Sequence, residues 1–351
     1  MAQFHALKIQ SIVRQTDKAV SITFEVPKSL KSEFTFKAGQ YITLKAVIND
    51  QEVRRDYSLS SSPASGSLTV TVKEIEGGLF SSYANTRLKT GDTLEVGSPN
   101  GRFLYETKKE NRNTVVAFAA GSGITPIMSI ARTILESETN TKFVLIYGNK
   151  SPKETIFHQE ILDLQTRHSD RFNIQFVYSE TDETGALFGR IDAGIVNYAL
   201  KNLIDIDAAQ KFYLCGPEGM IHTVNSILTE KGVEASQILF ELFTASAVES
   251  PSNTTIKKGD SEITILVDEE ETTFSMPQKQ TILEAALSRD VDAPYSCQGG
   301  VCSSCICRVT EGSASMRQNN ILTDNEVAEG LVLSCQAEPT SAKIKVDFDD
   351  I

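Results

Sequence analysis

The sequence lacks several features that would place it in large classes of protein. It has no run of about eighteen apolar residues, the length that a membrane-spanning helix requires. Its N-terminal stretch has no apolar core followed by a small-residue cleavage site, so it is not a secretory signal. The net charge of −12 argues against a nucleic-acid partner. We therefore expect a cytoplasmic protein that acts on neither membrane nor nucleic acid.

Length and charge distribution indicate several domains. With 351 residues, 40% of them apolar and 23% charged, the chain is long enough for two or three globular domains. Residues 251–351 contain 8 Lys and Arg against 17 Asp and Glu, a balance of −9, which leaves −3 for the first 250 residues. An acidic last third indicates a separate module. Two explanations of this acidic charge stay open: the module docks on a basic surface of a partner, or the charge serves only to keep the protein in solution.

The first 108 residues read as a small antiparallel β-barrel. Short runs alternate between apolar and polar residues, and Gly, Pro and Asn separate them, which is the pattern of antiparallel strands. The expected strands cover residues 6–13, 19–26, 40–48, 67–75 and 92–98.

A different pattern follows from 109 to 243. Apolar strands such as TVVAFAA and KFVLIYG alternate with segments of helical period such as PIMSIARTILESE. This alternation predicts a doubly wound parallel sheet of the α/β class. The small, polar stretch 244–259 reads as a linker. A third module, 260–351, begins with a hairpin pattern, continues with a helix and a Cys-rich loop, and closes with the strand KIKVDFD.

Cysteines crowd into the last module. In a reducing compartment, clustered thiols read as metal ligands before disulfides. Cys297, Cys302 and Cys305 form C-x4-C-x2-C, and Cys335 follows downstream, which is the spacing of a plant-type [2Fe–2S] cluster. Cys307 does not fit this spacing, and we expect it to be an ordinary strand residue.

Two other metal centres fit the cysteines less well. A four-cysteine zinc site normally uses two C-x2-C pairs, and only one such pair exists here. A Rieske centre needs two histidine ligands, and all four histidines lie outside the module, at His5, His158, His168 and His222. The segment PYSCQGGVCSSCICRV with LSCQ downstream resembles a plant-type ferredoxin, a resemblance that covers about the last 90 residues.

The barrel region contains residues suited to a flavin. In Arg55-Asp56-Tyr57-Ser58, a guanidinium can pair with a diphosphate, a ring can stack on the isoalloxazine, and a hydroxyl can bond a ring nitrogen. Gly78 and Ser81 belong to a turn before a short predicted helix, whose N-terminal amides would receive a phosphate.

These features, in this order, resemble the ferredoxin–NADP reductase superfamily. The resemblance implies that Arg55, Gly78 and Ser81 hold the flavin diphosphate, that Tyr57 stacks on the ring, and that Ser58 faces the reactive nitrogen. A grip on a diphosphate favours FAD, although FMN stays open because some relatives use it.

The second domain opens with a glycine-rich turn, Gly121-Ser122-Gly123-Ile124-Thr125-Pro126. It follows the first parallel strand and starts a helix, where a dinucleotide pyrophosphate would sit. The form G-x-G-x-x-P differs from the dehydrogenase fingerprint and resembles the reductase superfamily. We therefore expect Gly121, Gly123, Thr125 and Pro126 to bind the nucleotide.

A second turn in this domain is Cys215-Gly216-Pro217. By resemblance, these three residues lie beside the nicotinamide, where Cys215 orients the hydride donor and is not a nucleophile. We expect Cys215 and Ser58 to be the two residues nearest the atoms between which the hydride is transferred. For the adenosine end, Lys150 and Lys153 favour NADPH, whereas Glu180 favours NADH; we expect NADPH and keep NADH as the alternative.

The order of barrel, nucleotide domain and ferredoxin implies an oxidoreductase that passes electrons from NAD(P)H through FAD and a [2Fe–2S] cluster to a partner. Reductases with a C-terminal ferredoxin include those of phenylacetyl-CoA epoxidase, ketosteroid hydroxylase and the phthalate or vanillate type. The last module resembles the phenylacetyl-CoA epoxidase type most, so a terminal oxygenase is the expected partner. The other reductase types and a non-catalytic redox sensor are the alternatives.

Overall fold

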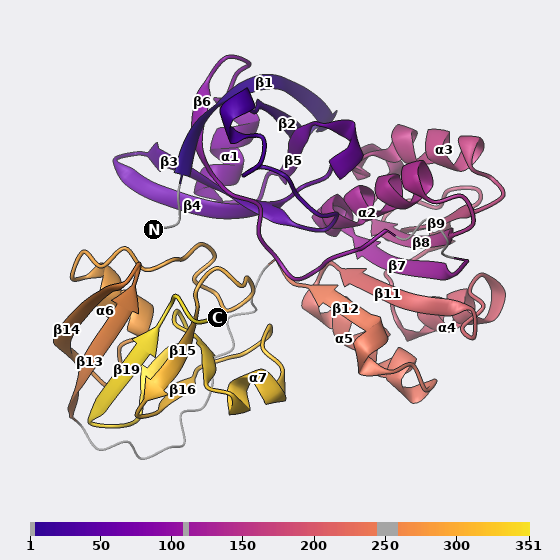
Figure 1. Cartoon of the computed structure of the whole chain (residues 1–351). Coiled ribbons are helices and arrows are strands. Elements are labelled where there is room, and N and C mark those ends of the chain that lie inside the picture. The colour runs from indigo at the N-terminus through magenta and orange to yellow at the C-terminus, as the bar shows by residue number, and fades with distance from the viewer. Residues whose placement is uncertain (1–3, 108–111, 244–258) are drawn as a thin grey trace. The chain divides into compact units, whose positions relative to one another are not determined.

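The computed structural model describes residues 4–107, 112–243 and 259–351 (Figure 1). The described residues form two compact units, one within Phe4–Phe243 and one made of residues 259–351. The predicted boundary near 108 falls on residues outside the described chain, as does the predicted linker 244–259 except for its last residue. No helix among the described residues is long and apolar enough to cross a membrane.

The N-terminal part of the first unit is a curled antiparallel sheet in the order β4-β3-β6-β1-β2-β5. Its strands are β1 (Phe4–Thr16), β2 (Ala19–Glu25), β3 (Tyr41–Ile48), β4 (Gln51–Ser58), β5 (Leu68–Lys73) and β6 (Thr93–Gly97). Directly after β4, Leu59 pairs with Val70 of β5, which joins the two edges and closes the barrel. The predicted strands are confirmed, and the alternating apolar residues fill the interior because side chains on a strand alternate between faces.

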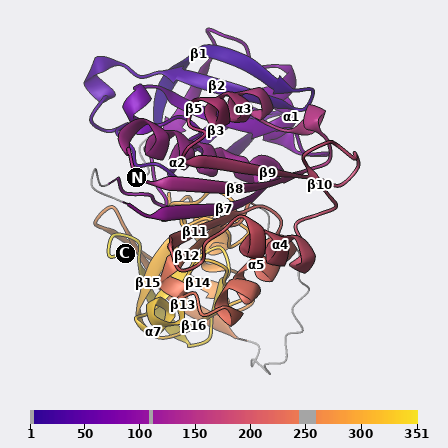
Figure 2. The same ribbon diagram turned by 90° about the vertical axis from the view of Figure 1, so that its right-hand side faces the viewer.

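The second part of this unit is a six-stranded parallel sheet in the order β10-β9-β8-β7-β11-β12. Its strands are β7 (Thr114–Ala120), β8 (Lys142–Asn149), β9 (Phe172–Tyr178), β10 (Leu187–Phe188), β11 (Ala209–Cys215) and β12 (Ile238–Glu241). Helices α2 (Ile124–Ser137) and α3 (His158–Arg167) cover the face nearer the barrel, and α4 (Ala193–Asn202) and α5 (Glu218–Glu230) cover the other (Figure 2).

Sequence reasoning missed α4 and β10. Only Val196 and Ala199 of α4 are buried, so the helix carries too few apolar residues to produce a helical period. Strand β10 has two residues, which is shorter than any periodic pattern.

The C-terminal unit is a mixed sheet of the β-grasp kind, in the order β14-β13-β19-β15-β17. Its strands are β13 (Asp260–Val267), β14 (Glu270–Pro277), β15 (Ile306–Glu311), β17 (Leu331–Leu333) and β19 (Lys343–Asp347), with β16 (Ala314–Met316) and β18 (Ala337–Pro339) forming a second, small sheet. The predicted hairpin is β13–β14, and β19 returns parallel to β13. Helix α6 (Ile282–Leu287) starts at a capping box of Thr281 and Glu284. A short helix, α7 (Asp324–Ala328), was not predicted.

Candidate functional site

Strand β4 places the predicted flavin residues at its end. Ser58 is buried, and the Tyr57 ring is half-buried against Phe80 of helix α1 (Leu79–Thr86), with ring centroids 5.5 Å apart. Burial raises the pKa of Tyr57, so its phenol stays neutral. Arg55 is exposed, and its Nη1 donates to the carbonyl oxygen of Arg54 at 2.6 Å. Its guanidinium therefore lies along the outer side of the strand that carries Tyr57 and Ser58.

The turn before α1 is held from inside by Ser81. The Ser81 Oγ accepts from the Ile75 amide at 3.1 Å and donates to the Gly78 carbonyl at 3.4 Å. A Cβ on Gly78 would lie 2.4 Å from that Oγ, so a larger residue there would displace the Ser81 hydroxyl. Because the hydroxyl is used within the turn, any phosphate contact by Ser81 falls to its backbone amide.

The glycine-rich turn lies between β7 and α2. Gly121 has a φ of +54°, which favours glycine, and a Cβ on Gly123 would lie 2.1 Å from the Cys215 carbonyl oxygen. Thr125 is buried, and its Oγ1 donates to the Ser122 carbonyl at 3.1 Å. Pro126 is buried in the first turn of α2, where its missing N–H leaves no helical bond unmade. The turn is thus packed directly on the strand end that carries Cys215.

The second turn follows β11. Cys215 is fully buried, and burial, with Glu241 nearby, raises the pKa of its thiol well above the usual range. A neutral thiol agrees with the prediction that this residue is not a nucleophile. A Cβ on Gly216 would lie 2.8 Å from the Met220 side chain, and Pro217 directly precedes α5.

A hydrogen bond joins the end of the barrel strand β4 to the carboxyl edge of the parallel sheet. The Ser58 Oγ donates to Glu241 Oε2 at 3.1 Å, across 183 residues of chain. Glu241 ends β12 and is the register partner of Cys215 in β11. The structure therefore brings together the two residues predicted to lie nearest the chemistry, through a carboxyl group that was not predicted as a site residue.

The Glu241 carboxyl group is perturbed. Burial raises its pKa to about 8; Asp56 adds to the shift and the Ser58 hydrogen bond opposes it. It is therefore mostly protonated at neutral pH. The available signal in the sequence was a charged residue within the apolar run ILFELF, at the carboxyl edge of a parallel strand.

Lys73 is a second residue that sequence reasoning missed. It ends β5, and its Nζ would lie 3.5 Å from a Cβ on Gly121. Burial lowers its pKa, with Glu154 opposing the shift, and among the described residues it has neither a hydrogen bond nor an ion pair. A half-buried ammonium beside a phosphate-type turn fits a dinucleotide pyrophosphate. Its signal in the sequence was only a Lys at the end of an alternating strand.

Lys150, which favours NADPH, and Glu180, which favours NADH, form an ion pair at the carboxyl edge of β8 and β9. Lys150 Nζ lies 3.1 Å from Glu180 Oε1, and the Glu180 amide donates to the Lys150 carbonyl at 2.9 Å. Both side chains are largely exposed. The predicted cation for a 2′-phosphate therefore has an acidic neighbour on its own edge of the sheet.

The four predicted cluster cysteines gather as two pairs. Cys305 and Cys335 have their Sγ atoms 3.3 Å apart, too far for a disulfide, and Cys302 hydrogen-bonds Cys297. That hydrogen bond, and amides including that of Gly299 at 3.3 Å, lower the Cys297 pKa to about 6. A lowered pKa favours the thiolate, which is the form that binds metal.

The surroundings of these pairs fit a [2Fe–2S] cluster. Two thiolates per iron is what the cluster requires. In the described chain, no three His, Cys, Asp or Glu side chains are arranged to hold a single ion. Ser296 and Ser334, which directly precede Cys297 and Cys335, are buried with hydroxyls that have no partner among the described residues. Such hydroxyls can donate to cluster sulfur.

Side chains also support the loop itself. Gln318 Nε2 donates to the Gly299 carbonyl at 2.7 Å, and Gln336 Nε2 donates to the Gln298 carbonyl at 3.1 Å. Cys307 lies in β15 with its side chain buried, as expected for a strand residue.

Comparison with known proteins agrees with this arrangement. Residues 7–105 match the oxidoreductase FAD-binding domain, 118–226 the oxidoreductase NAD-binding domain, and 265–340 the 2Fe-2S iron-sulfur cluster binding domain. One subunit of the 1,2-phenylacetyl-CoA epoxidase from Escherichia coli is 36% identical over 99% of both chains. The ferredoxin reductase component of 3-ketosteroid-9-alpha-monooxygenase from Rhodococcus rhodochrous is 31% identical over 97% of this chain and 96% of that one.

A solved structure has the same fold throughout. Phthalate dioxygenase reductase is similar with a TM-score of 0.61 and 24% identity, over 98% of each chain. The chain therefore belongs to the family of reductase components found in oxygenase systems such as 1,2-phenylacetyl-CoA epoxidase and 3-ketosteroid-9-alpha-monooxygenase, and it is an oxidoreductase that passes electrons from NAD(P)H through FAD to a [2Fe–2S] cluster.

Proposed function

We propose that this chain is the reductase of a phenylacetyl-CoA epoxidase type oxygenase, with its hydride-transfer site at Ser58, Cys215 and Glu241. When bound, the flavin accepts a hydride and the cluster passes single electrons onward. The observation that carries the site is the Ser58–Glu241 hydrogen bond, with Cys215 opposite Glu241 in the sheet. It brings the barrel residue proposed for the flavin to the strand ends proposed for the nicotinamide.

The remaining residues bind and orient. Arg55 and the α1 amides hold the flavin diphosphate, and the Tyr57 ring lies on the isoalloxazine. The Gly121–Gly123 turn and Lys73 hold the nucleotide pyrophosphate. The hydride itself supplies the hydrogen that the flavin gains, so this step needs no proton from the protein. The Ser58 hydroxyl, held by its hydrogen bond to the Glu241 carboxyl, would orient the flavin ring at the strand ends.

An anaerobic titration tests the hydride site. Addition of NAD(P)H to Ser58→Ala should leave flavin bound but slow its reduction by about a hundredfold, the cost of a misplacement of about 1 Å at the reacting atoms. Ser65→Ala is the matched control, because Ser65 follows in the same barrel and its hydroxyl bonds only the backbone of Ser62 and Ser67. Flavin reduction at the parental rate in Ser58→Ala would contradict the proposed site.

The partner is identified by reconstitution. The protein should support NAD(P)H-dependent turnover by phenylacetyl-CoA epoxidase whose own reductase component is left out. The oxygenase of the ketosteroid 9-alpha-monooxygenase system is the comparison, since its reductase is 31% identical to this chain. Turnover with the ketosteroid oxygenase alone would reassign the partner and leave the internal electron path unchanged.

For the nucleotide, we propose that the Lys150–Glu180 pair sets the preference. A carboxylate at this edge accepts from the ribose 2′-hydroxyl of NADH, whereas a free cation meets the 2′-phosphate of NADPH. Glu180→Gln should raise kcat/KM for NADPH relative to NADH by roughly tenfold, because it unmasks the Lys150 charge. An unchanged ratio would place the 2′ position elsewhere.

A further inference from the structure

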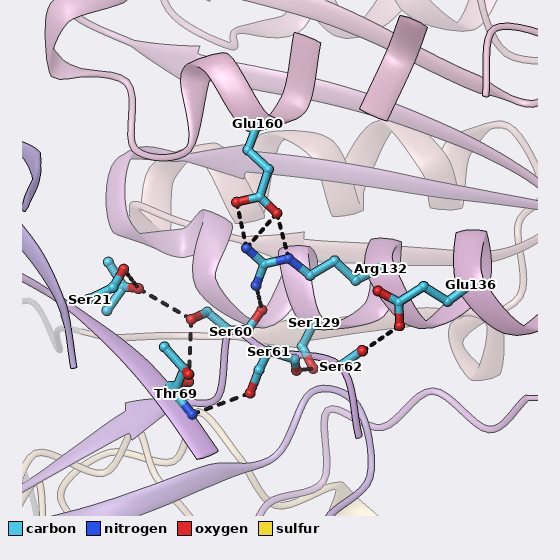
Figure 3. Close-up of polar contacts among 10 residues, drawn as sticks. Ser21, Ser60, Ser61, Ser62, Thr69, Ser129, Arg132, Glu136 and Glu160 are labelled. Atoms are coloured by element: carbon cyan, nitrogen blue, oxygen red, sulfur yellow. Dashed lines mark hydrogen bonds and ion pairs between the residues drawn. The ribbon is translucent and has the colours of Figure 1, made fainter. Parts of the chain in front are cut away.

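Three consecutive serines begin two residues after Ser58, the last residue of β4. Ser60, Ser61 and Ser62 each form a hydrogen bond with helix α2 of the nucleotide domain (Figure 3). Only Leu59, fixed by its pairing with Val70, separates them from Ser58. Any shift of α2 against this segment is therefore transmitted to the Ser58 end of β4.

Arg132 of α2 lies at the centre of these contacts. Its Nη1 donates to the Ser60 carbonyl, and its Nε and Nη2 donate to the two carboxylate oxygens of Glu160 in α3 at 2.8 and 2.7 Å (Figure 3). The guanidinium also lies 5.1 Å from the centre of the Phe157 ring. With 16% of its side chain exposed, Arg132 is held on three sides, and a bidentate pair fixes orientation as well as distance.

Two more residues of α2 complete the attachment. The Ser129 Oγ donates to the Ser61 carbonyl at 2.7 Å, and Glu136 Oε2 accepts from the Ser62 Oγ at 2.5 Å. With Arg132, these residues are spaced three and four apart, so they form one stripe along the helix. This stripe faces the serine segment.

Glu160, which accepts from Arg132, lies on a helix that begins after a residue with a left-handed backbone conformation. Phe157, directly before α3, has a φ of +61° and is buried. A bulky residue adopts this conformation only when its surroundings impose it. Here it places an aromatic ring beneath the guanidinium and starts the helix that carries Glu160.

We propose that Arg132 is a positioning residue for hydride transfer, which holds α2 and its N-terminal Gly121–Gly123 turn at a set distance from the Ser58 segment. A helix is stiff, so fixing its body fixes the turn at its start. The inference rests on the proposed assignment of Ser58 to the flavin and of the turn to the nucleotide. Hydride transfer needs reacting atoms within about 3–3.5 Å, and a misplacement of about 1 Å can cost a hundredfold.

Arg132→Ala and Arg132→Lys test the proposal in the full, cofactor-loaded protein. Lysine keeps the charge but has no planar fork, so it cannot form the bidentate pair with Glu160 that fixes the orientation of Arg132. Three quantities are measured per bound flavin: the rate of flavin reduction at saturating NAD(P)H, the nucleotide dissociation constant, and the long-wavelength charge-transfer absorbance of nicotinamide against flavin. The last reports ring alignment and is not an activity.

The matched control is Arg171→Ala. Arg171 also binds α2, since its Nη2 donates to the Leu135 carbonyl at 2.6 Å, but its side-chain hydrogen bonds to the described residues all stay within the nucleotide domain. If Arg132→Ala does not fold, Ser129→Ala serves in its place. It removes one hydrogen bond between the domains and should slow reduction by about fivefold, the equivalent of roughly 1 kcal/mol.

We expect both Arg132 variants to slow flavin reduction at least tenfold and to weaken the charge-transfer band, with nucleotide affinity within about threefold of the parent. Arg171→Ala should match the parent in all three quantities. Reduction within a factor of about two of the parent in Arg132→Ala, or equal slowing in Arg171→Ala, overturns the inference. If the parent protein itself shows neither flavin reduction by NAD(P)H nor the charge-transfer band, the proposed function on which this inference rests is overturned instead.

Discussion

Glu241 makes the stability of the first unit depend on pH in an unusual direction. A carboxyl group whose pKa is raised on folding keeps its proton in the folded state while the unfolded chain releases it. Its contribution to stability is therefore greatest below the ordinary pKa of 4.5 and is lost as pH rises toward about 8. Most paired carboxylates act in the opposite direction, because their folded-state pKa is lowered.

The size of the effect follows from these two values. Each pH unit between them costs about 1.4 kcal/mol, and the slope flattens near the upper value, so the loss from pH 6 to pH 8 is roughly 2 kcal/mol. For a unit of about 240 residues, this corresponds to a fall of roughly 4–8 °C in melting temperature. Glu241→Gln should abolish the fall, because the amide oxygen still accepts from Ser58 but has no proton to lose.

Calorimetry of parent and variant at pH 6, 7 and 8 measures the effect, and the useful quantity is the difference in melting temperature at each pH. Subtraction removes every titration common to both proteins, including those of His158 and His168. Glu230→Gln, a change at an exposed carboxylate of the same domain that forms no side-chain hydrogen bond or ion pair with the described residues, should give no pH-dependent difference. A Glu241→Gln difference that is the same at pH 6 and pH 8 would refute the reasoning.

Three further outcomes are expected. Lys73→Met should raise KM for NAD(P)H roughly tenfold with little change in kcat or flavin content, since it removes one charge-assisted contact; an unchanged KM would count against a pyrophosphate contact. Cys335→Ser should abolish the cluster absorbance while NAD(P)H still reduces the flavin, whereas Cys307→Ala should keep the cluster; loss of the cluster in both would contradict the ligand assignment. Ser334→Ala should lower the cluster reduction potential by tens of millivolts, because hydrogen bonds to sulfur stabilise the reduced form, and redox titration followed by EPR would detect it. A potential that stays within error of the parent would show that this hydroxyl bonds elsewhere.

A site could be predicted from the sequence where its residues lie close together in the chain. Cys297, Cys302 and Cys305 lie within nine residues, so their spacing alone constrains how their thiolates can converge. The barrel and the parallel sheet were predictable for a related reason, since side chains along one strand alternate faces whatever the strand packs against. Ser81 marks the limit of this reasoning, because the pattern indicated a phosphate ligand while the hydroxyl bonds its own turn.

The sequence by itself determined the kinds of module and their order, and it predicted the four cysteines proposed as cluster ligands, because these depend on residues close together in the chain. Tertiary structure alone decided how the modules of the first unit share a site. It brought Glu241 to Ser58 across 183 residues, Lys73 to the Gly121 turn, and Arg132 to the Ser60 carbonyl. Such contacts depend on how helices and sheets pack, and neither periodicity nor spacing within one segment carries that information.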